Sequence, residues 1–459
     1  MSNYLLIDFG STYTKITAVD VDNAVVLGTA RGITTVTTDI MDGLNQALKV
    51  LFLQTGKLEF QRTLACSSAA GGLKMVAIGL VPEMTAEAAK RAALGAGAKV
   101  LGVYCHELSE YEIEEIEALN PDIILLAGGT DGGNKQVILH NAEMLTTLKQ
   151  DVSVIVAGNK SVTPAAVKML SKKMTEVLHT ENVMPRLDEL NIEPARQVIR
   201  QVFLQRIVEA KGLNRANHLV DRLVMPTPSA VMRAAELLSR GSGHEAGLGD
   251  LMVVDIGGAT TDMYSIAKGD PTQSSVVLRG LPEPLAKRTV EGDLGMRYSA
   301  TALLKAAGLK LIADYAGVDE DAVAAYVKKV ENNIDYLPAD AIENAVEVGM
   351  GRACVQLSAD RHVGSLETHY TPYGSTFVQT GKDLTAAPVV IGTGGVIITS
   401  PLPEGILQGV QFDETAPHLL KPQNPRYLVD REYIMASMGL LGEELPDLAV
   451  RMMKKYIAG

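Results

Sequence analysis

The chain alternates between apolar runs of strand length and amphipathic stretches of helical period, and the order of the two changes along its length. Up to about residue 67, the pattern predicts strands at 4–8, 14–20 and 24–30, a helix at 42–54 and a strand at 63–66. Three strands therefore precede the first helix, and this βββαβ order opens the first domain.

The next region, about 67–183, has a different rhythm in which single strands and helices alternate. The predicted strands lie at 75–81, 99–104, 123–127 and 152–157, and the predicted helices at 85–95, 110–119, 136–149 and 164–173. Such alternation is typical of a parallel, doubly wound sheet. We expect an α/β insertion in the first domain.

A glycine-rich stretch, Gly241–Gly247, follows two further predicted helices at 194–211 and 228–240 and has the composition of a linker. We place the domain boundary there, with domain I at 1–245 and domain II at 246–425. Domain II has predicted strands at 251–255, 262–267 and 273–279, and helices at 296–307, 319–332 and 339–359 that form a helical insertion of about 296–359. A Pro-rich connection at 401–425 leads to a helical segment at 426–459, which we expect to return to domain I.

The stretch from Leu251 to Asp262 combines an apolar strand, a glycine turn and two acids. Glycines let backbone amides approach an anion closely, so this hairpin could cradle a phosphate. Asp255 at the strand end and Asp262 on the returning strand could hold a hydrated Mg²⁺ and orient a water at a terminal phosphate. An ordinary hairpin with surface carboxylates is the alternative.

The same device occurs near the N-terminus. Residues 4–15 repeat the apolar strand, Asp8 at its end, Gly10 two residues later and a turn rich in hydroxyls. The two copies differ at one position, where the first has Lys15 and the second Asp262. One hairpin therefore offers a cation to phosphates, and the other an acid to metal or water.

Three other segments are second-tier candidates. The turn Gly392-Thr393-Gly394-Gly395 follows an apolar strand and could pass under a base or ribose. Glu291 and Asp293, predicted at the start of a helix, suit either a ribose or adenine contact or an N-cap. The Gly128–Gly133 loop ends a predicted strand and suits either a ligand site or a flexible turn.

Composition narrows the function classes. The 459 residues are 47% hydrophobic and 21% charged, which predicts a multidomain protein with substantial cores. The net charge of −12 and the absence of a Lys/Arg cluster argue against nucleic acid or an anionic membrane as the main partner. Three distant cysteines, Cys66, Cys105 and Cys354, predict core thiols rather than a metal site. The N-terminus begins directly with a strand, and we expect a cytoplasmic location.

The three glycine turns resemble the two phosphate motifs and the adenosine motif of the actin, sugar-kinase and heat-shock-chaperone ATPase superfamily. This resemblance implies an α/β fold with two ribonuclease-H-like domains around a nucleotide cleft. Over nearly the whole chain, the similarity is to the MutL or GlmL family, accessory proteins encoded with adenosylcobalamin-dependent glutamate mutase and unrelated to the mismatch-repair protein that shares the first name. The segments that carry the similarity are 7–12, 126–133, 255–262, 290–295, 361–362 and 391–395.

The family resemblance implies an ATP-dependent chaperone that reactivates a mutase by promoting exchange of damaged cobalamin. The client would be glutamate mutase or, as in a relative, ornithine aminomutase. Asp8 and Asp255 would hold Mg²⁺ through its waters, and Asp262 or Asp255 would orient the attacking water. The residues expected to contact ATP are Gly10, Ser11, Thr12, Lys15, Gly257, Gly258, Ala259, Thr260, Thr261, Glu291, Asp293, Gly392, Thr393, Gly394 and Gly395.

Three other classes of function would use the same phosphate-binding hairpins. A small-molecule kinase would need an acid positioned on a substrate hydroxyl. An ATP-driven hydrolase or acetyl-CoA-ligase-type activator is close in motif, although such activators usually bring cysteines for a metal cluster. An actin-like filament former would be a structural protein.

Overall fold

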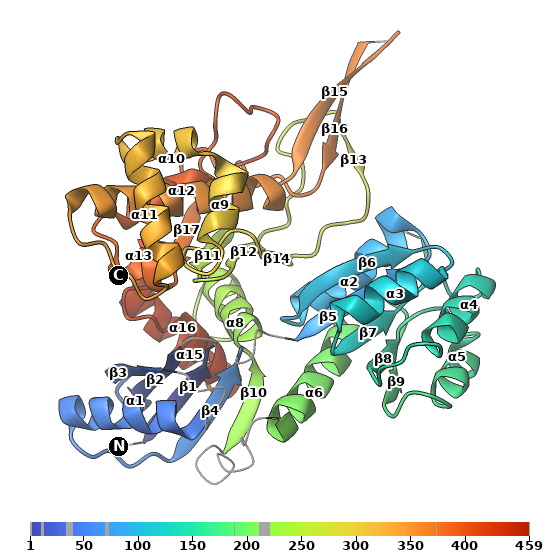
Figure 1. Cartoon of the computed structure of the whole chain (residues 1–459), viewed down its shortest axis with the longest axis horizontal. Helices are drawn as coiled ribbons and strands as arrows, with labels where there is room; N and C mark the ends of the chain where they lie inside the picture. Colours follow the sequence, from blue (N-terminus) through green and yellow to red (C-terminus); the bar gives the residue numbers. More distant parts are fainter. Residues whose placement is uncertain are drawn as a thin grey trace. The chain divides into compact units, whose positions relative to one another are not determined.

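The fold is described from a computed structural model that covers residues 2–10, 13–33, 40–68, 73–187, 189–210, 221–372 and 374–458. The chain forms two compact units: Met1–Val231 with Gly280–Pro282, and Met232–Arg279 with Glu283–Gly459 (Figure 1). The sequence boundary near residue 245 and the segment 426–459 both lie within the second unit. The assignment of domains stays a prediction.

The first unit contains a five-stranded sheet in the order β10-β4-β1-β2-β3. Its strands are β1 (Asn3–Phe9), β2 (Tyr13–Asp20), β3 (Val25–Ile33), β4 (Arg62–Ser67) and β10 (Arg222–Pro226). Strand β2 runs antiparallel to both of its neighbours, β1 and β3, whereas β4 and β10 run parallel to β1. Helix α1 (Ile40–Thr55) packs closely on β3, since a Cβ on Gly28 would lie 3.0 Å from Leu51 Cδ1. The predicted βββαβ order is confirmed, and β10 is an addition that the pattern did not predict.

The second unit repeats this sheet in the order β14-β12-β11-β17-β18. The strands are β11 (Leu251–Ile256), β12 (Thr261–Ile266), β14 (Ala286–Glu291), β17 (Val389–Thr393) and β18 (Arg426–Val429). The directions also match, since β12 runs antiparallel to both of its neighbours, β11 and β14, and β17 and β18 run parallel to β11. Two sheets of one topology confirm the predicted pair of ribonuclease-H-like folds.

One strand of the second sheet was predicted wrongly. The expected third strand at 273–279 contains β13 (Val276–Arg279), but β13 belongs to a separate sheet. The third strand of the central sheet is β14, which pairs with β12. β14 reads Ala-Lys-Arg-Thr-Val-Glu and buries an arginine, so it lacks the apolar pattern of a central strand.

The predicted insertion in the first unit is a doubly wound parallel sheet in the order β6-β5-β7-β8-β9. Its elements are β5 (Lys74–Gly79), β6 (Lys99–Cys105), β7 (Ile123–Leu126), β8 (Ser153–Val156) and β9 (Val177–His179), with α2 (Glu87–Gly95), α3 (Glu110–Leu119), α4 (Gln136–Leu145), α5 (Thr163–Leu170) and α6 (Glu193–Ala210). Side chains alternate along β5: Met75 and Ala77 pack with α2 and α6, whereas Val76 and Ile78 pack with α3, α4 and α5.

Helices surround the second sheet. They are α9 (Ala300–Ala307), α10 (Leu309–Ala316), α11 (Glu320–Asn332), α12 (Ala341–His362), α13 (Gly395–Thr399), α14 (Pro403–Leu407), α15 (Met435–Leu441) and α16 (Pro446–Met453), and α8 (Thr227–Arg240) precedes the sheet in the chain. Asp319 and Asp340 cap α11 and α12 by accepting bonds from Ala322 N and Glu343 N. The helix predicted at 296–307 starts later, at Ala300, because Met296 and Arg297 bond to the hairpin described below.

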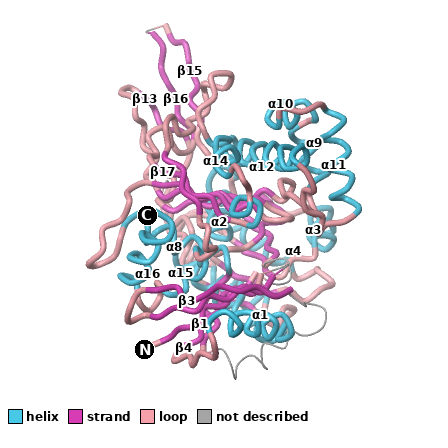
Figure 2. Tube along the Cα trace, turned by 90° about the vertical axis from the view of Figure 1, so that its left-hand side faces the viewer, coloured by secondary structure: helices cyan, strands magenta, loops and turns pink. Residues whose placement is uncertain are grey.

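Two segments that connect the main elements of the second unit have a defined structure of their own. The stretch Gly241–Gly247 folds back on α8, with Leu248 N donating to Leu238 O and a bridge between Gly241 and Ala246. Strands β13, β15 (Ser365–Thr371) and β16 (Gly374–Thr380) form a three-stranded ribbon in the order β13-β16-β15, with β15 and β16 as its long hairpin (Figure 2).

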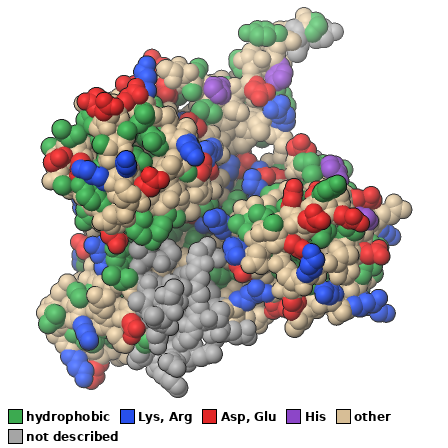
Figure 3. All heavy atoms as spheres, viewed as in Figure 1, with side chains coloured by type: hydrophobic (Ala, Val, Ile, Leu, Met, Phe, Trp, Pro, Cys, Tyr) green, Lys and Arg blue, Asp and Glu red, His purple; other side chains and the backbone are tan. Residues whose placement is uncertain are grey.

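The surface carries charges of both signs. On the face drawn in Figure 3, Lys and Arg side chains are interspersed with Asp and Glu in both units. Within the part of the chain that the structure describes, no helix has the length and hydrophobicity needed to cross a membrane.

Candidate functional site

The two glycine hairpins are structurally equivalent. Across β1 and β2, Asp8 pairs with Lys15, and across β11 and β12, Asp255 pairs with Asp262. The turns close in the same way, since the amide of Gly10 donates to Tyr13 O (3.1 Å) and the amide of Gly257 to Thr260 O (2.8 Å). The predicted exchange of Lys15 for Asp262 at one position is confirmed by the strand register.

The Asp8 carboxylate is held from three sides in the first unit. Its Oδ1 accepts a hydrogen bond from Thr227 Oγ1 (2.5 Å) and from the thiol of Cys66 (3.6 Å), and its Oδ2 faces Lys15 Nζ at 3.5 Å. Burial, and then the charge of Asp8, raise the pKa of Cys66 well above its ordinary value, so the thiol remains a donor. Thr227 was missed from the sequence because it lies 219 residues away. Ser11 and Thr12 lie outside the described residues.

The second hairpin presents free backbone donors. The amides of Gly258, Ala259 and Thr260 have no hydrogen-bond partner among the residues that the structure describes. The following loop fixes the turn from behind, since the amides of Met296 and Arg297 donate to Gly257 O and Gly258 O. Three successive donors of this kind are the geometry that binds an anion such as a phosphate.

Thr261, the last of the predicted contacts in this hairpin, is turned to the protein interior. Its buried hydroxyl donates to Leu294 O (2.5 Å). The side chain therefore ties the hairpin to the loop that follows β14.

Asp262 is paired with an arginine that the sequence did not single out. Arg288 Nε donates to Asp262 Oδ1 at 2.8 Å, and Nη2 lies 2.6 Å from the same oxygen. The Arg288 side chain is 4% exposed and that of Asp262 14%, so the pair is largely shielded from water. The arginine fixes the direction of the carboxylate. A single Arg within a polar strand gave no signal from which this contact could be foreseen.

The third glycine turn lies beside Asp255. Asp255 on β11 pairs with Thr393 on β17, and a Cβ on Gly394, whose φ is +92°, would lie 2.7 Å from Asp255 Oδ1. Thr393 Oγ1 donates to the buried Asp430, which was also missed. At Gly395 a Cβ would meet nothing within 4 Å, while Gly392 is packed against Ile397 and Leu407. The structure brings the second phosphate hairpin and this turn to one end of one sheet.

Glu291 and Asp293 join this end of the sheet but do not start a helix. Glu291 is the last residue of β14 and pairs with Thr261, and α9 begins only at Ala300. Arg361 Nη1 donates to Glu291 Oε2 (2.6 Å) and Asp293 Oδ1 (2.9 Å), and Nη2 donates to Asp293 Oδ2 (3.1 Å). The hydrogen bonds from Arg361 lower the pKa of Asp293.

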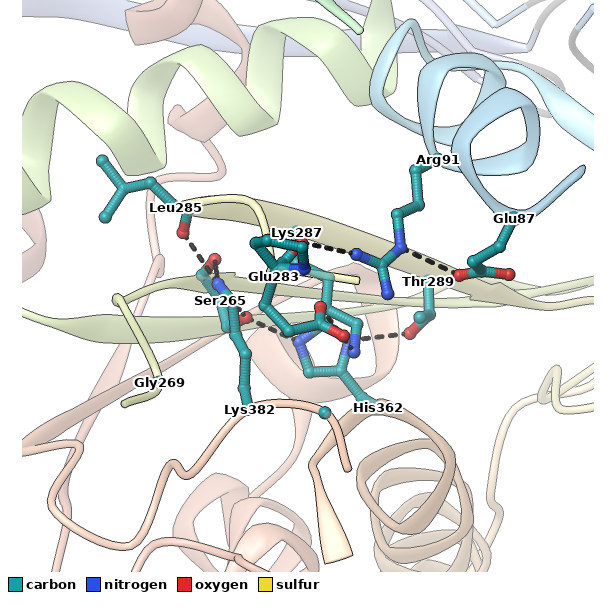
Figure 4. Close-up of polar contacts among 12 residues, drawn as sticks. Glu87, Arg91, Ser265, Gly269, Glu283, Leu285, Lys287, Thr289, His362 and Lys382 are labelled. Carbon is teal, nitrogen blue, oxygen red and sulfur yellow. Dashed lines mark hydrogen bonds and ion pairs between the residues drawn. The ribbon is translucent and has the colours of Figure 1, made fainter. Parts of the chain in front are cut away.

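A buried polar cluster lies behind these acids (Figure 4). His362, next to Arg361, bridges Ser265 Oγ (2.8 Å) and Thr289 Oγ1 (2.9 Å). Lys382 Nζ donates to Ser265 Oγ (3.2 Å) and to two backbone carbonyls, those of Leu285 (2.8 Å) and Ser265 (3.2 Å). Burial, reinforced by nearby Lys287, lowers the pKa of Lys382 to about 7.

The Gly128–Gly133 loop is tied down by two asparagines of the insertion. Asn159 donates to Gly133 O (3.2 Å) and Asn134 O (3.0 Å), and Asn182 donates to Gly129 O (2.9 Å). Gly128, Gly129 and Gly132 take positive φ angles, which explains the glycines of this turn. A separate ligand site in this loop stays a prediction.

The donor set fits a hydrated Mg²⁺ with ATP. Mg²⁺ keeps several waters and is usually held by one or two carboxylates together with phosphates. Asp8 in the first unit and Asp255 in the second each end a strand beside a glycine turn, and each has the kind of oxygen ligand that a hydrated Mg²⁺ accepts. The described residues contain no group of three or more His, Cys, Asp or Glu side chains that could hold a metal ion.

Known proteins with similar structures are distant. A diol dehydratase-reactivating factor in nucleotide-free form is 10% identical, with 96% of this chain and 99% of that chain covered and a TM-score of 0.37. Xylulose kinase from Lactobacillus acidophilus is 10% identical, with 100% and 92% covered and a TM-score of 0.38. Scores this low carry no argument about function, and the fold rests on the sheet topology.

The sequence relationship is much closer. The MutL protein of Clostridium tetanomorphum is 52% identical over 459 residues, which is 100% of this chain and 99% of that protein. The family model described as MutL protein matches residues 4–457. The chain belongs to the MutL protein family.

Proposed function

We propose that the protein binds and hydrolyses Mg·ATP. The observation that carries this proposal is the pair of equivalent hairpins, in which a strand-end aspartate faces Lys15 in one copy and Asp262 in the other. The cation of the first hairpin would bind phosphate, and the second acid of the other hairpin would activate water. A duplication that served only the fold would not require this division.

The residues of the second hairpin act on the phosphates in the proposed mechanism. The free amides of Gly258, Ala259 and Thr260 donate to phosphate oxygens, and Lys15 leaves Asp8 to offset the charge of the terminal phosphates. When bound, Mg²⁺ would neutralise phosphate charge, and Asp8 and Asp255 are the carboxylates that would hold it through its waters.

Asp262 orients the attacking water. Its carboxylate accepts a hydrogen bond from the water, while Arg288 holds the other side of the group. Because the arginine holds one oxygen and fixes the direction of the group, Asp262 serves mainly to aim the water. No covalent intermediate on the protein is needed.

The proposed client is an adenosylcobalamin-dependent mutase. Membership of the MutL family supports glutamate mutase as this client, and ornithine aminomutase is the alternative. ATP binding and phosphate loss would favour different conformations, and the attached surfaces would release damaged cobalamin from the mutase. The α/β insertion is larger than a phosphate clamp requires, and we assign client docking to it.

Two experiments test the proposal in order. Calorimetry with ATP and ADP in millimolar magnesium should detect binding, and no binding of either would remove its basis. Mutase inactivated during turnover should then regain activity with intact coenzyme, this protein and Mg·ATP, but not with a non-hydrolysable analogue. Both mutases should be offered.

The matched variant for testing client docking carries substitutions on the surface of the α/β insertion. It should bind ATP normally and fail to rescue. Equal rescue by the analogue, or no rescue of either mutase, would favour a small-molecule kinase or an ATP-dependent hydrolase.

A further inference from the structure

The last two residues of α12 contact the end of β14 and the residues next to it. Arg361 contacts Glu291, the last residue of β14, and Asp293 just beyond it. His362 is buried against Ser265 of β12 and Thr289 of β14 (Figure 4). Two consecutive side chains therefore connect the helix to one strand end.

The Arg361 contacts have a defined geometry. The guanidinium holds Asp293 through two parallel bonds of 2.9 and 3.1 Å and reaches Glu291 with a third contact of 2.6 Å. Without the arginine, two carboxylates separated by one residue would repel each other and separate. With it, both carboxylates are held in place, and each retains lone pairs that can accept further hydrogen bonds.

His362 fixes the point from which Arg361 extends. The imidazole is fully buried, and burial, followed by the charges of Lys287 and Lys382, lowers its pKa well below the ordinary value. The neutral ring must donate with one nitrogen and accept with the other. Of the two hydroxyls, Ser265 Oγ and Thr289 Oγ1, one therefore donates to the ring and the other accepts from it.

The neighbouring hairpin indicates what the acids would bind. Glu291 pairs with Thr261, directly after the free amides of Gly258, Ala259 and Thr260. Carboxylates repel phosphates but accept hydrogen bonds from vicinal hydroxyls, so a nucleotide with its phosphates on these amides would present its ribose to the acids.

We propose that Arg361 is a positioning residue that orients Glu291 and Asp293 toward the ribose hydroxyls of the nucleotide, and that His362 anchors Arg361 for this task. The inference rests on the proposed ATP binding. It assigns recognition of the sugar to the two acids that the arginine positions, separate from recognition of the phosphates by the hairpin amides.

The test compares three ligands on the full chain by calorimetry: ATP, 2′-deoxy-ATP and tripolyphosphate. Arg361→Met should weaken ATP binding about tenfold, the scale of a lost hydrogen bond to a charged group. It should also remove the preference for ATP over 2′-deoxy-ATP and leave tripolyphosphate binding within about twofold. Arg361→Lys should restore part of the preference.

A double-mutant cycle separates positioning from direct contact. In a chain carrying Glu291→Gln and Asp293→Asn, adding Arg361→Met should cause no further loss, because its effect acts through the acids. His362→Gln should give a smaller loss of ATP affinity that also disappears in the Arg361→Met chain. Arg279→Met, which removes a surface pair with Glu367 on the three-stranded ribbon, is the matched control and should bind all three ligands normally.

Two results would overturn the inference. Unchanged ATP binding by Arg361→Met would show that the acids need no positioning, and a fully additive cycle would show that the arginine touches the nucleotide itself. If the unaltered protein binds none of the ligands, the proposed ATP function fails and this inference with it.

Discussion

The hairpins β1–β2 and β11–β12 have the same register and the same turn closure, yet they solve the same electrostatic problem in different ways. In the first, the partner of the strand-end acid is Lys15, 25% exposed and 3.5 Å from Asp8. In the second, the position opposite Asp255 is another acid, and the cation comes from Arg288 on the next strand. The first hairpin contains its own cation, whereas the cation of the second is a buried arginine on the neighbouring strand.

This difference separates a movable charge from a fixed one. A partly exposed lysine on a long stem can leave Asp8 for a phosphate at little cost. The Arg288 guanidinium is 4% exposed, and moving it would leave Asp262 as an unpaired, largely buried charge. The first hairpin is therefore suited to binding, and the second to holding a preorganised acid.

The largest expected effect comes from the turn glycines. Gly258→Val should weaken ATP binding by more than about 100-fold, because a branched side chain would occupy the space before the free amides. A Cβ at Gly258 would lie 3.4 Å from Arg297 Cβ, whereas at Gly10 it would lie 2.6 Å from Tyr13 O. Gly258→Ala should consequently fold normally, and Gly10→Ala should disturb its hairpin.

Calorimetry and circular dichroism on these variants check both halves of that prediction. A Gly258→Val protein that binds ATP within tenfold of the unaltered chain would contradict the phosphate cradle.

Replacing the acids of the second hairpin should lower the rate of ATP hydrolysis rather than the affinity for nucleotide. Asp255→Asn or Asp262→Asn should reduce ATP hydrolysis by roughly 100-fold while nucleotide binding is retained, as expected when a preorganised charge is removed. Lys15→Met should show the reverse pattern and mainly weaken binding. Steady-state hydrolysis with calorimetry measures the two quantities, and normal hydrolysis by both acid variants would disprove the water-orienting role.

The two cations should differ in their effect on stability. Arg288→Met should lower the free energy of unfolding by about 2 kcal/mol, less than for a fully buried pair because the Asp262 side chain is 14% exposed. Lys15→Met should change it by less than about 1 kcal/mol. Urea denaturation of both variants provides the comparison, and equal effects would remove the distinction between a fixed and a movable charge.

The last expected effect is a pH dependence in the second unit. The pKa of Lys382 is about 7 in the folded protein and 10.5 for an ordinary lysine, so between these values the unfolded chain binds more protons. Stability should therefore rise with pH above 7, by at most about 1.4 kcal/mol per pH unit from this group. Lys382→Met should flatten the rise in urea-denaturation midpoints between pH 7 and 9, and an unchanged slope would assign it to other groups.

The sequence predicted the elements whose side chains follow a simple period. Strands β1, β2, β11 and β12 alternate or run apolar because their faces are buried, and α3 was located at its observed bounds. Strand β14 was missed because it buries Arg288 through an ion pair, so a strand of the central sheet reads as polar. The more apolar Val276–Arg279 was taken instead and forms the ribbon.

The partners of the site acids could not be predicted. Thr227 reaches Asp8 across 219 residues, Arg361 reaches Glu291 across 70, and Asp430 reaches Thr393 across 37. Only the sheet order and the end of α12 bring these residues together. Motif spacing reports the local turn, whereas the electrostatic environment of each acid is set by tertiary structure.

The three cysteines give the molecule a separate chemical reporter in each of three regions. Cys66 is buried beside Asp8, Cys105 is half-buried at the end of β6 in the insertion, and Cys354 is buried in α12. Burial raises the pKa of each thiol, to about 12 for Cys354, so the reactive thiolate is scarce while its surroundings stay folded. For the two buried thiols, Cys66 and Cys354, the rate of modification by an alkylating reagent would thus report the opening of the surrounding region, without a label being introduced.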